Sequence, residues 1–248
     1  MPSVRNYTAL APLYDRILAA GFDYVALGEF IAALIARFAP GPRSILELGA
    51  GTCPLARLQV FPPAAKIVYS DLSASMLALA QAGSAPLRAA VDATAIPFKA
   101  RFDVCLMLMD ACNYLLTDGQ VSACLKGVFR VLRPGGIFVL NLAGETVVRE
   151  CVDALRVSGE ADGMAYDLES RFDRKSRILE TDFAFVALAG GGGIRRERHR
   201  QRIHRRETIG TLALEAGFRI EGCFEGRGFE TAGDDARDIH FVLTRPLL

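Results

Sequence analysis

Apolar and polar residues follow two different periods along this chain of 248 residues. In the first part, short apolar runs recur and each breaks into glycine or acidic residues, as expected for strands buried in a parallel sheet. These predicted strands span residues 44–48, 66–69, 102–108 and 137–142. From residue 164 the period is two, which predicts antiparallel strands at residues 165–173, 178–186 and 194–206. Helical spacing at residues 27–38 and 207–217 places the chain in the α/β class.

The first predicted strand ends in a glycine turn. Residues 45–54 read Ile-Leu-Glu-Leu-Gly-Ala-Gly-Thr-Cys-Pro, and Pro54 is suited to begin a helix. Glycines at positions 49 and 51 let the backbone approach a ligand closely. A strand, a glycine turn and a helix form the corner at which α/β sheets bind nucleotides. The Gly-x-Gly-x-x-Gly pattern of dinucleotide sites fails here, because Pro54 stands at the third glycine.

Acidic residues follow the next two strands. Asp71 comes twenty residues after Gly51, where a carboxylate can accept both hydroxyls of an adenosine ribose, and Leu72 and Met76 are suited to pack on an adenine. Asp92 follows a third short apolar stretch and is placed to accept from the adenine amino group. Five features then occur in order: Glu47-x-Gly49-x-Gly51, Asp71, Asp92, Phe102-Asp103 and Leu132-Arg-Pro-Gly-Gly. This order resembles class I S-adenosylmethionine (SAM) dependent methyltransferases throughout residues 43–142.

The resemblance implies a Rossmann-like sheet, mostly parallel with an antiparallel last strand, and SAM as the cofactor. Backbone at Leu108 and Met109 is expected at the methionine end of SAM. The full set of expected cofactor residues is Glu47, Gly49, Ala50, Gly51, Asp71, Leu72, Met76, Asp92, Ala93, Leu108 and Met109. The chain departs from the family at Cys53, where a third glycine is common.

Two further segments resemble small-molecule methyltransferases related to the glycine and amino-sugar N-methyltransferases. Tyr14-Asp15, then Asp23-Tyr24 and an amphipathic helix, resembles their N-terminal lid, and implies that Tyr14 lies over the cofactor near the methyl group. The segment at residues 110–115 resembles their Asp-x-x-Asn-Tyr-Leu, and implies that Asp110, Asn113 and Tyr114 face the acceptor. Simple packing of Tyr14 and Tyr114, with Asp110 as a helix cap, is the alternative interpretation.

Four regions follow from these patterns. We expect residues 1–42 to form the N-terminal helical lid and residues 43–142 the SAM-binding core. Residues 143–206 are expected to contain a small antiparallel sheet inserted on the substrate side, and residues 207–248 the last helix and strands of the core.

The last inserted strand carries the strongest charge feature of the chain. Strand alternation places Arg196, Arg198, Arg200, Arg202 and His204 on one face and Glu197, His199, Gln201 and Ile203 on the other. The arginine face is suited to a phosphate or carboxylate of an anionic acceptor or to a nucleic acid backbone, but ion pairs with Glu180 and Asp182 are favoured. His199 and Arg202 match a His-x-x-Arg arrangement of the family. The His199 face is therefore expected to line the acceptor pocket.

Composition excludes several function classes. The net charge is +1 and no aromatic residue lies between the arginines, so nucleic acid is not an expected partner. No apolar run approaches membrane-spanning length and none begins a signal peptide. The six cysteines show neither Cys-x-x-Cys nor metal spacing with histidine, so no metal is expected and the cytoplasm is the expected location.

The favoured function is methyl transfer from SAM to a small-molecule acceptor, with nitrogen preferred because a neutral amine needs no strong base. The candidate catalytic residues are Tyr14, Asp110, Asn113 and His199. O-methylation with His199 or Asp110 as base stays open. An NAD-linked oxidoreductase shares the glycine turn and Asp71, but the chain has no recognisable Tyr-x-x-x-Lys pair. A non-catalytic SAM-binding protein is the third alternative, and the acceptor and the oligomeric state stay open.

Overall fold

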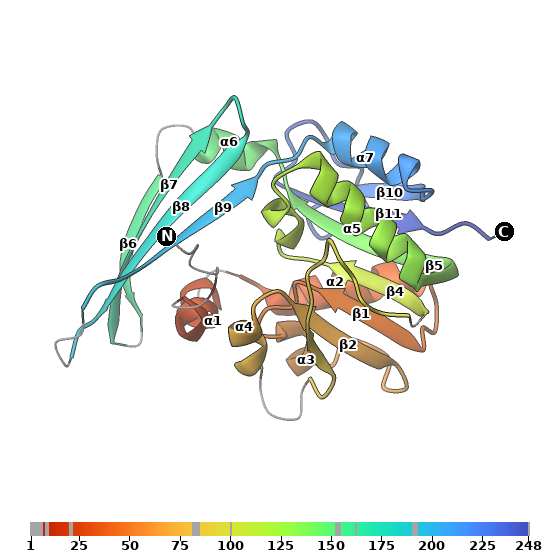
Figure 1. Ribbon diagram of the computed structural model, residues 1–248, viewed down its shortest axis with the longest axis horizontal. Coiled ribbons are helices and arrows are strands. Elements are labelled where there is room, and N and C mark those ends of the chain that lie inside the picture. The colour runs from red at the N-terminus through yellow and green to blue at the C-terminus, as the bar shows by residue number, and fades with distance from the viewer. Residues whose placement is uncertain are drawn as a thin grey trace.

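The larger of two sheets forms the core of the protein. The computed structural model describes residues 7, 10–19, 22–80, 85–99, 101–151, 155–161, 163–189 and 193–247. The seven strands of this sheet run in the order β10-β11-β5-β4-β1-β2-β3 (Figure 1). Their bounds are β1 (Ser44–Leu48), β2 (Lys66–Asp71), β3 (Arg88–Ala90), β4 (Phe102–Met107), β5 (Leu132–Ala143), β10 (Arg219–Glu225) and β11 (Asp238–Thr244). β1 to β5 pair in parallel, and β11 is antiparallel to both neighbours. The predicted mostly parallel sheet with an antiparallel last strand is confirmed.

Helices cover both faces of this sheet. The buried side of α2 (Tyr24–Phe38) packs with Leu55 of α3 (Pro54–Leu58) against one face, on Ile45, Val104 and Val139. On the other face, α5 (Asp118–Val131) and α7 (Arg206–Glu215) pack on residues such as Leu46 and Phe138. α5 begins with a capping box in which Thr117 and Gln120 satisfy each other's backbone N–H groups. β5 starts five residues before the predicted position, and its register with β4 shifts between Phe102 and Val104.

The second sheet is antiparallel, with strand order β6-β7-β8-β9, and lies to one side of the core (Figure 1). Its strands are β6 (Leu155–Ala161), β7 (Met164–Asp173), β8 (Ile178–Ala187) and β9 (Arg195–Arg202). β7 and β8 lie at the predicted positions. β6 is an additional strand that the sequence analysis did not predict, because most of its residues are exposed and it contains Gly159. α6 (Glu145–Cys151) follows β5 on the way to this sheet.

The prediction of a strand over residues 194–206 is wrong at the C-terminal end of that range. β9 stops at Arg202, Ile203 N–H donates to the carbonyl of Arg177, and Arg206 already begins α7. His204 therefore does not share the arginine face, and only 3% of its surface is exposed. The alternation within β9 itself is as expected, with Arg196, Arg198 and Arg200 exposed and Glu197 and His199 buried.

The helix α1 (Ala11–Ala19) lies between the antiparallel sheet and the core (Figure 1). Leu10 and Leu13 pack with Phe185 of β8 in one apolar cluster. On the core side, the Asp15 carboxylate accepts a hydrogen bond from Thr52 (2.6 Å) and pairs with Arg57 (2.9 Å). These contacts hold α1 beside the glycine turn. Within the described ranges, no helix has the length and apolar character needed to cross a membrane.

Candidate cofactor and acceptor site

The glycine turn after β1 has the backbone conformation that glycine favours. Gly49 and Gly51 have φ angles of +69° and +57°. A Cβ atom on Gly49 would lie 2.6 Å from Cβ of Ala111, so a side chain there would collide with the segment after β4. Cys53, which stands where the family often has glycine, also has a positive φ of +58°. A cysteine in this conformation costs about 1–3 kcal/mol of backbone strain.

Asp71 closes this turn. Its carboxylate accepts from the backbone N–H of Gly51 (2.8 Å) and of Ser73 (2.7 Å), each through a different oxygen. Burial raises the pKa of Asp71, and these two backbone hydrogen bonds partly offset that effect. A carboxylate oxygen can accept more than one hydrogen bond. The two oxygens therefore keep capacity for the ribose hydroxyls that the sequence analysis assigned to them.

Glu47 is buried beneath the turn with 4% of its surface exposed. In the described part of the chain its Oε2 atom has no hydrogen-bond partner. Burial, and then the charge of Asp71, raises the pKa of Glu47 to about 8. A buried polar atom without a partner is costly unless a ligand satisfies it. The cationic methionine end of SAM carries N–H donors of the required kind, so Glu47 and the glycine turn fit this cofactor.

The other expected cofactor residues lie around the same edge of the sheet. Asp92 accepts from the backbone and side chain of Thr94 through one oxygen. Leu72 is 71% exposed, which leaves its side chain accessible to the predicted adenine. Met76 is buried with its methyl carbon 3.3 Å from the Cβ position of Gly51. Ala50 and Leu108 are buried, and Ala93 and Met109 are partly buried. The roles of these residues stay predictions.

The segment after β4 turns sharply at the predicted acceptor side. Met109 and Asp110 have positive φ angles of +51° and +60° before the short helix η1 (Ala111–Tyr114). Asp110 N–H donates to the side chain of Asn141 (2.8 Å), and the amide nitrogen of Asn141 donates to the carboxylate of Asp238. Burial, and then the charge of Asp238, raises the pKa of Asp110 to about 7. Asp238, at the start of β11, was missed because nothing in its local sequence signals a site.

Asn113 uses both ends of its side-chain amide on the backbone. Its nitrogen donates to the carbonyl of Arg202 (2.8 Å), and its oxygen accepts from the N–H of Ala143 (3.1 Å). It is fully buried. Asn113 thus ties η1 to the ends of β9 and β5, which favours a positioning role over the expected contact with the acceptor.

His199 lies at the centre of a buried polar cluster that spans three parts of the chain. Its Nδ1 is 2.8 Å from the hydroxyl of Tyr114, and its Nε2 is 2.8 Å from Glu197. The hydroxyl of Tyr114 is in turn 2.5 Å from that of Tyr7. Because both ring nitrogens already have partners, His199 is poorly placed to remove a proton from an acceptor directly. Tyr7 and Glu197 were missed as site residues, and only the side-chain alternation of β9 connected Glu197 with His199.

Tyr14 lies beside this cluster. Its ring packs edge-on against Tyr7 at a centroid distance of 5.3 Å, and burial raises its pKa well above the usual value. Its expected position over the methyl group stays a prediction. Ile203, expected to line the pocket, instead packs with Ala143 and Leu179.

Arg198 and Arg200 of β9 form the expected ion pairs with Glu180 and Asp182 of β8. Arg198 makes a two-pronged contact with Asp182 (2.6 and 2.9 Å), and it also lies 3.2 Å from Glu180. Arg200 lies 3.7 Å from the same glutamate, while Arg202 pairs with Asp118. All three arginines therefore have carboxylate partners within the chain.

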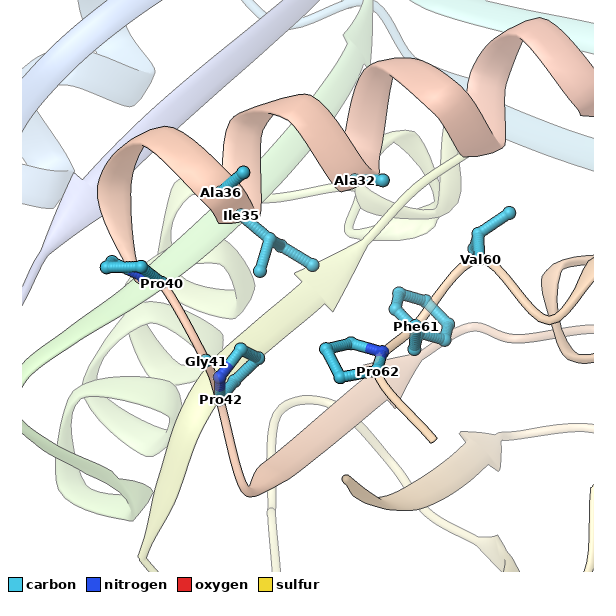
Figure 2. Close-up of a pocket in the computed structure, with 9 residues that line it drawn as sticks. All are labelled: Ala32, Ile35, Ala36, Pro40, Gly41, Pro42, Val60, Phe61 and Pro62. Carbon is cyan, nitrogen blue, oxygen red and sulfur yellow. The ribbon is translucent and has the colours of Figure 1, made fainter. Parts of the chain in front are cut away.

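Two cavities lie outside this edge of the sheet. The first, of about 400 Å³, lies between Ile35 of α2, Pro42 and Phe61 (Figure 2). Since Pro42 precedes β1, this cavity is at the amino end of the parallel strands, away from the end where such sheets bind ligands. The second, of about 410 Å³, lies beyond β5 between Gly144, Arg177 and Arg206. Neither is lined by the glycine turn.

Comparison with known proteins agrees with this geometry. Residues 45–136 match a family model described as a methyltransferase domain. The Bacillus subtilis protein YqeM, which carries a provisional methyltransferase assignment, is 26% identical over 220 residues that cover 86% of this chain and 87% of YqeM. A SAM-dependent methyltransferase from Clostridium acetobutylicum has a TM-score of 0.83 at 20% identity, covering 97% of this chain and 99% of that chain. The sugar N-methyltransferase KedS8 from Streptoalloteichus has a TM-score of 0.75 at 20% identity, covering 94% and 92%.

The structural matches share the fold of this chain. The domain match spans the glycine turn, Asp71, Asp92 and the segment after β4. These matches agree with SAM as the cofactor, and they give no support to the NAD-linked alternative. The chain thus contains a methyltransferase domain at residues 45–136, in a fold that it shares with SAM-dependent methyltransferases.

Proposed function

We propose that this enzyme methylates a nitrogen atom of a small-molecule amine, held between the segment at residues 110–114 and the antiparallel sheet. The observation that carries this proposal is the raised pKa of Asp110 beside a second carboxylate. Its carboxyl group lies near the carboxylate of Asp238, and its pKa is raised to about 7. Two neighbouring carboxyl groups attract a cationic amine, and one of them titrates near neutral pH, where it can take up a proton.

The chemistry that SAM supplies when bound is a methyl group on a positively charged sulfur, which the lone pair of the acceptor displaces. An ammonium ion has no lone pair, so it must first lose a proton. The Asp110 carboxylate is suited to accept that proton at its oxygen. Asn141 accepts from the backbone N–H of Asp110 and donates to the carboxylate of Asp238, so the backbone of Asp110 and the carboxylate of Asp238 are held in place. Alignment of the two reactants then supplies much of the rate enhancement.

Several observations support nitrogen over oxygen. A hydroxyl acceptor needs a stronger base, and both nitrogens of His199 are already engaged. Arg198, Arg200 and Arg202 of β9 pair with acids, which does not favour an anionic acceptor. Two structures of similar fold are described as a sugar N-methyltransferase and an amino pentose methyltransferase. We keep the cytoplasm as the expected location, on the cysteine pattern.

A methyl-transfer assay with a panel of paired small molecules tests this proposal. Each pair consists of an amine and the alcohol of the same carbon skeleton, with amino sugars included, and release of the demethylated cofactor is measured. Amines are expected to be methylated and alcohols not. With an active amine, kcat should rise with pH through about 7 as Asp110 loses its proton, and Asp110→Asn should remove that rise while leaving SAM affinity unchanged. Methylation of alcohols alone would contradict the proposal.

A further inference from the structure

The polar cluster around His199 is a continuous chain of hydrogen bonds. It runs from Glu197 to His199 (2.8 Å), on to Tyr114 (2.8 Å), and ends at Tyr7 (2.5 Å). Glu197 and His199 belong to β9, Tyr114 belongs to η1, and Tyr7 precedes α1. Only 4% of Glu197 and 2% of His199 are exposed. The Glu197 end of this hydrogen-bond chain is thus screened from water, and its hydrogen-bond pattern is set by protein groups.

The direction of this chain follows from its first member. One oxygen of Glu197 accepts from the backbone N–H of Tyr7, and the other accepts from the N–H of Leu10 (2.9 Å). A backbone N–H can only donate, so both oxygens act as acceptors, and this arrangement favours the carboxylate form of Glu197. His199 must then donate to it from Nε2. A neutral imidazole with its proton on Nε2 has an acceptor at Nδ1.

The remaining two hydrogens are then fixed in turn. Tyr114 has one hydroxyl hydrogen, and it donates that hydrogen to Nδ1 of His199. The oxygen of Tyr114 must therefore accept from the hydroxyl of Tyr7. The Tyr7 hydrogen points into the cluster, and its oxygen lone pair is directed away from the cluster.

Tyr7 ends this chain beside the predicted SAM site. Its backbone carbonyl accepts from the hydroxyl of Ser73 (3.4 Å), two residues after Asp71. Burial raises its pKa well above the usual value, and Tyr114, Asp71 and Glu197 add to this effect, so the phenol stays protonated. Its ring packs edge-on against both Tyr14 (5.3 Å) and His199 (4.6 Å).

We propose that Glu197 is a positioning residue for methyl transfer: it fixes the Nε2–H tautomer of His199, which orients the Tyr7 hydroxyl through Tyr114, and it holds the start of α1 against β9. The kinetic part of this inference rests on the methyl transfer proposed above. The tautomer part does not, because it is a property of the protein alone.

Nitrogen-15 NMR of the imidazole side chains tests the tautomer. The full chain has only three histidines, and His199→Gln identifies the signals of His199 by their loss. In the wild type, His199 should be neutral with its proton on Nε2. Glu197→Ala should give a mixture of tautomers, and Glu197→Gln, which keeps one acceptor oxygen, should largely retain the wild-type tautomer. Arg198→Ala, on the opposite face of β9, is the matched control and should change nothing.

A wild-type His199 that carries its proton on Nδ1, or on both nitrogens, would overturn the proposal. An unchanged tautomer in a folded Glu197→Ala would do the same. Circular dichroism of each variant checks folding. If Glu197→Ala does not fold, Glu197→Gln is compared with the wild type instead, and His199 must then have the same tautomer in both proteins.

Kinetics test the role of the Tyr7 hydroxyl. Tyr7→Phe keeps the ring and removes the end of the hydrogen-bond chain, so kcat should fall at least tenfold with the SAM dissociation constant unchanged. Tyr166→Phe is the control, since Tyr166 belongs to the same apolar cluster but its hydroxyl lies against Gly159. Equal kcat values for the wild type and Tyr7→Phe would contradict this role. If the wild type methylates no amine, the function proposed above is wrong, and the NMR result still decides the tautomer.

Discussion

Glu47 and Asn113, two polar residues that the sequence assigned to the site, are buried in opposite hydrogen-bond states. Asn113 satisfies two backbone groups through its amide, whereas Glu47 keeps an oxygen without a partner in the described structure. A saturated buried amide stabilises the fold, and an unsatisfied buried carboxyl group is suited to a ligand. At the scale of single residues, hydrogen-bond state therefore separates positioning residues from binding residues.

For Asn113, this distinction gives a measurable expectation. Asn113→Ala leaves the carbonyl of Arg202 and the N–H of Ala143 without their partner, so the free energy of unfolding should fall by about 2 kcal/mol or more. Asn113→Asp keeps the acceptor for the N–H of Ala143, so its free energy of unfolding should lie between those of the wild type and Asn113→Ala. Denaturant unfolding of the three proteins measures these free energies. A fully stable Asn113→Ala with a large loss of kcat would instead indicate a catalytic residue.

The sequence identified residues of the site where a motif was local, and missed those that depend on the fold. The turn at Gly49 and Gly51 and the acid at Asp71 lie within one strand–turn–helix unit and the strand after it. Tyr7 and Glu197 are 190 residues apart and meet only because Tyr7 and Leu10, which precede α1, lie against β9. Asp238 faces the site because β11 pairs with β5. No local pattern carries such pairings.

At the scale of elements, α1 is attached on two sides. Glu197 of β9 accepts the N–H groups of Tyr7 and Leu10 at its start, and Asp15 in the helix contacts Thr52 of the glycine turn and Arg57 of α3. The helix thus joins the antiparallel sheet to the cofactor edge. Strong hydrophobic periods predicted the core strands and α2, whereas the mostly exposed β6 has no such period.

The attachment through Asp15 is expected to affect cofactor binding as well as stability. Asp15→Ala removes the contacts of α1 with Thr52 and Arg57. These contacts are partly exposed and together contribute about 1 kcal/mol. The SAM dissociation constant should therefore rise about fivefold. Asp23→Ala is the control: it removes the cap of α2, which costs about 1 kcal/mol of stability, without touching the glycine turn. An unchanged SAM affinity in Asp15→Ala would show that α1 does not support the turn.

At the scale of the whole molecule, one edge of the core sheet gathers the ligand-binding groups, and the antiparallel sheet and α1 lie beside that edge (Figure 1). Glu47, Asp71 and Asp110 concentrate buried carboxyl groups there, and all three pKa values are raised. A site that holds acids in this state destabilises the protein when they ionise without a cationic ligand.

The stability of the protein without ligand should consequently depend on Glu47. Its pKa is about 8 in the folded state against 4.5 for an ordinary glutamate, so the folded state binds more protons between these values. Stability from this group is present below about pH 4.5 and is lost as the pH rises through about 8. Glu47→Gln cannot ionise, and should become progressively more stable than the wild type from pH 5 to pH 8 in denaturant unfolding. Parallel stability curves for the two proteins would refute the raised pKa.

Calorimetric titration of SAM into the wild type and Asp71→Ala tests the central claim, that the edge formed by the glycine turn and Asp71 binds SAM. The wild type should bind SAM and its demethylated product, and should not bind NAD(H). Asp71→Ala removes a charged acceptor for two ribose hydroxyls, each worth about 1.5–3 kcal/mol, so affinity should fall at least tenfold with an unchanged circular dichroism spectrum. Equal SAM dissociation constants for the two proteins, or preferential binding of NAD(H), would contradict the account.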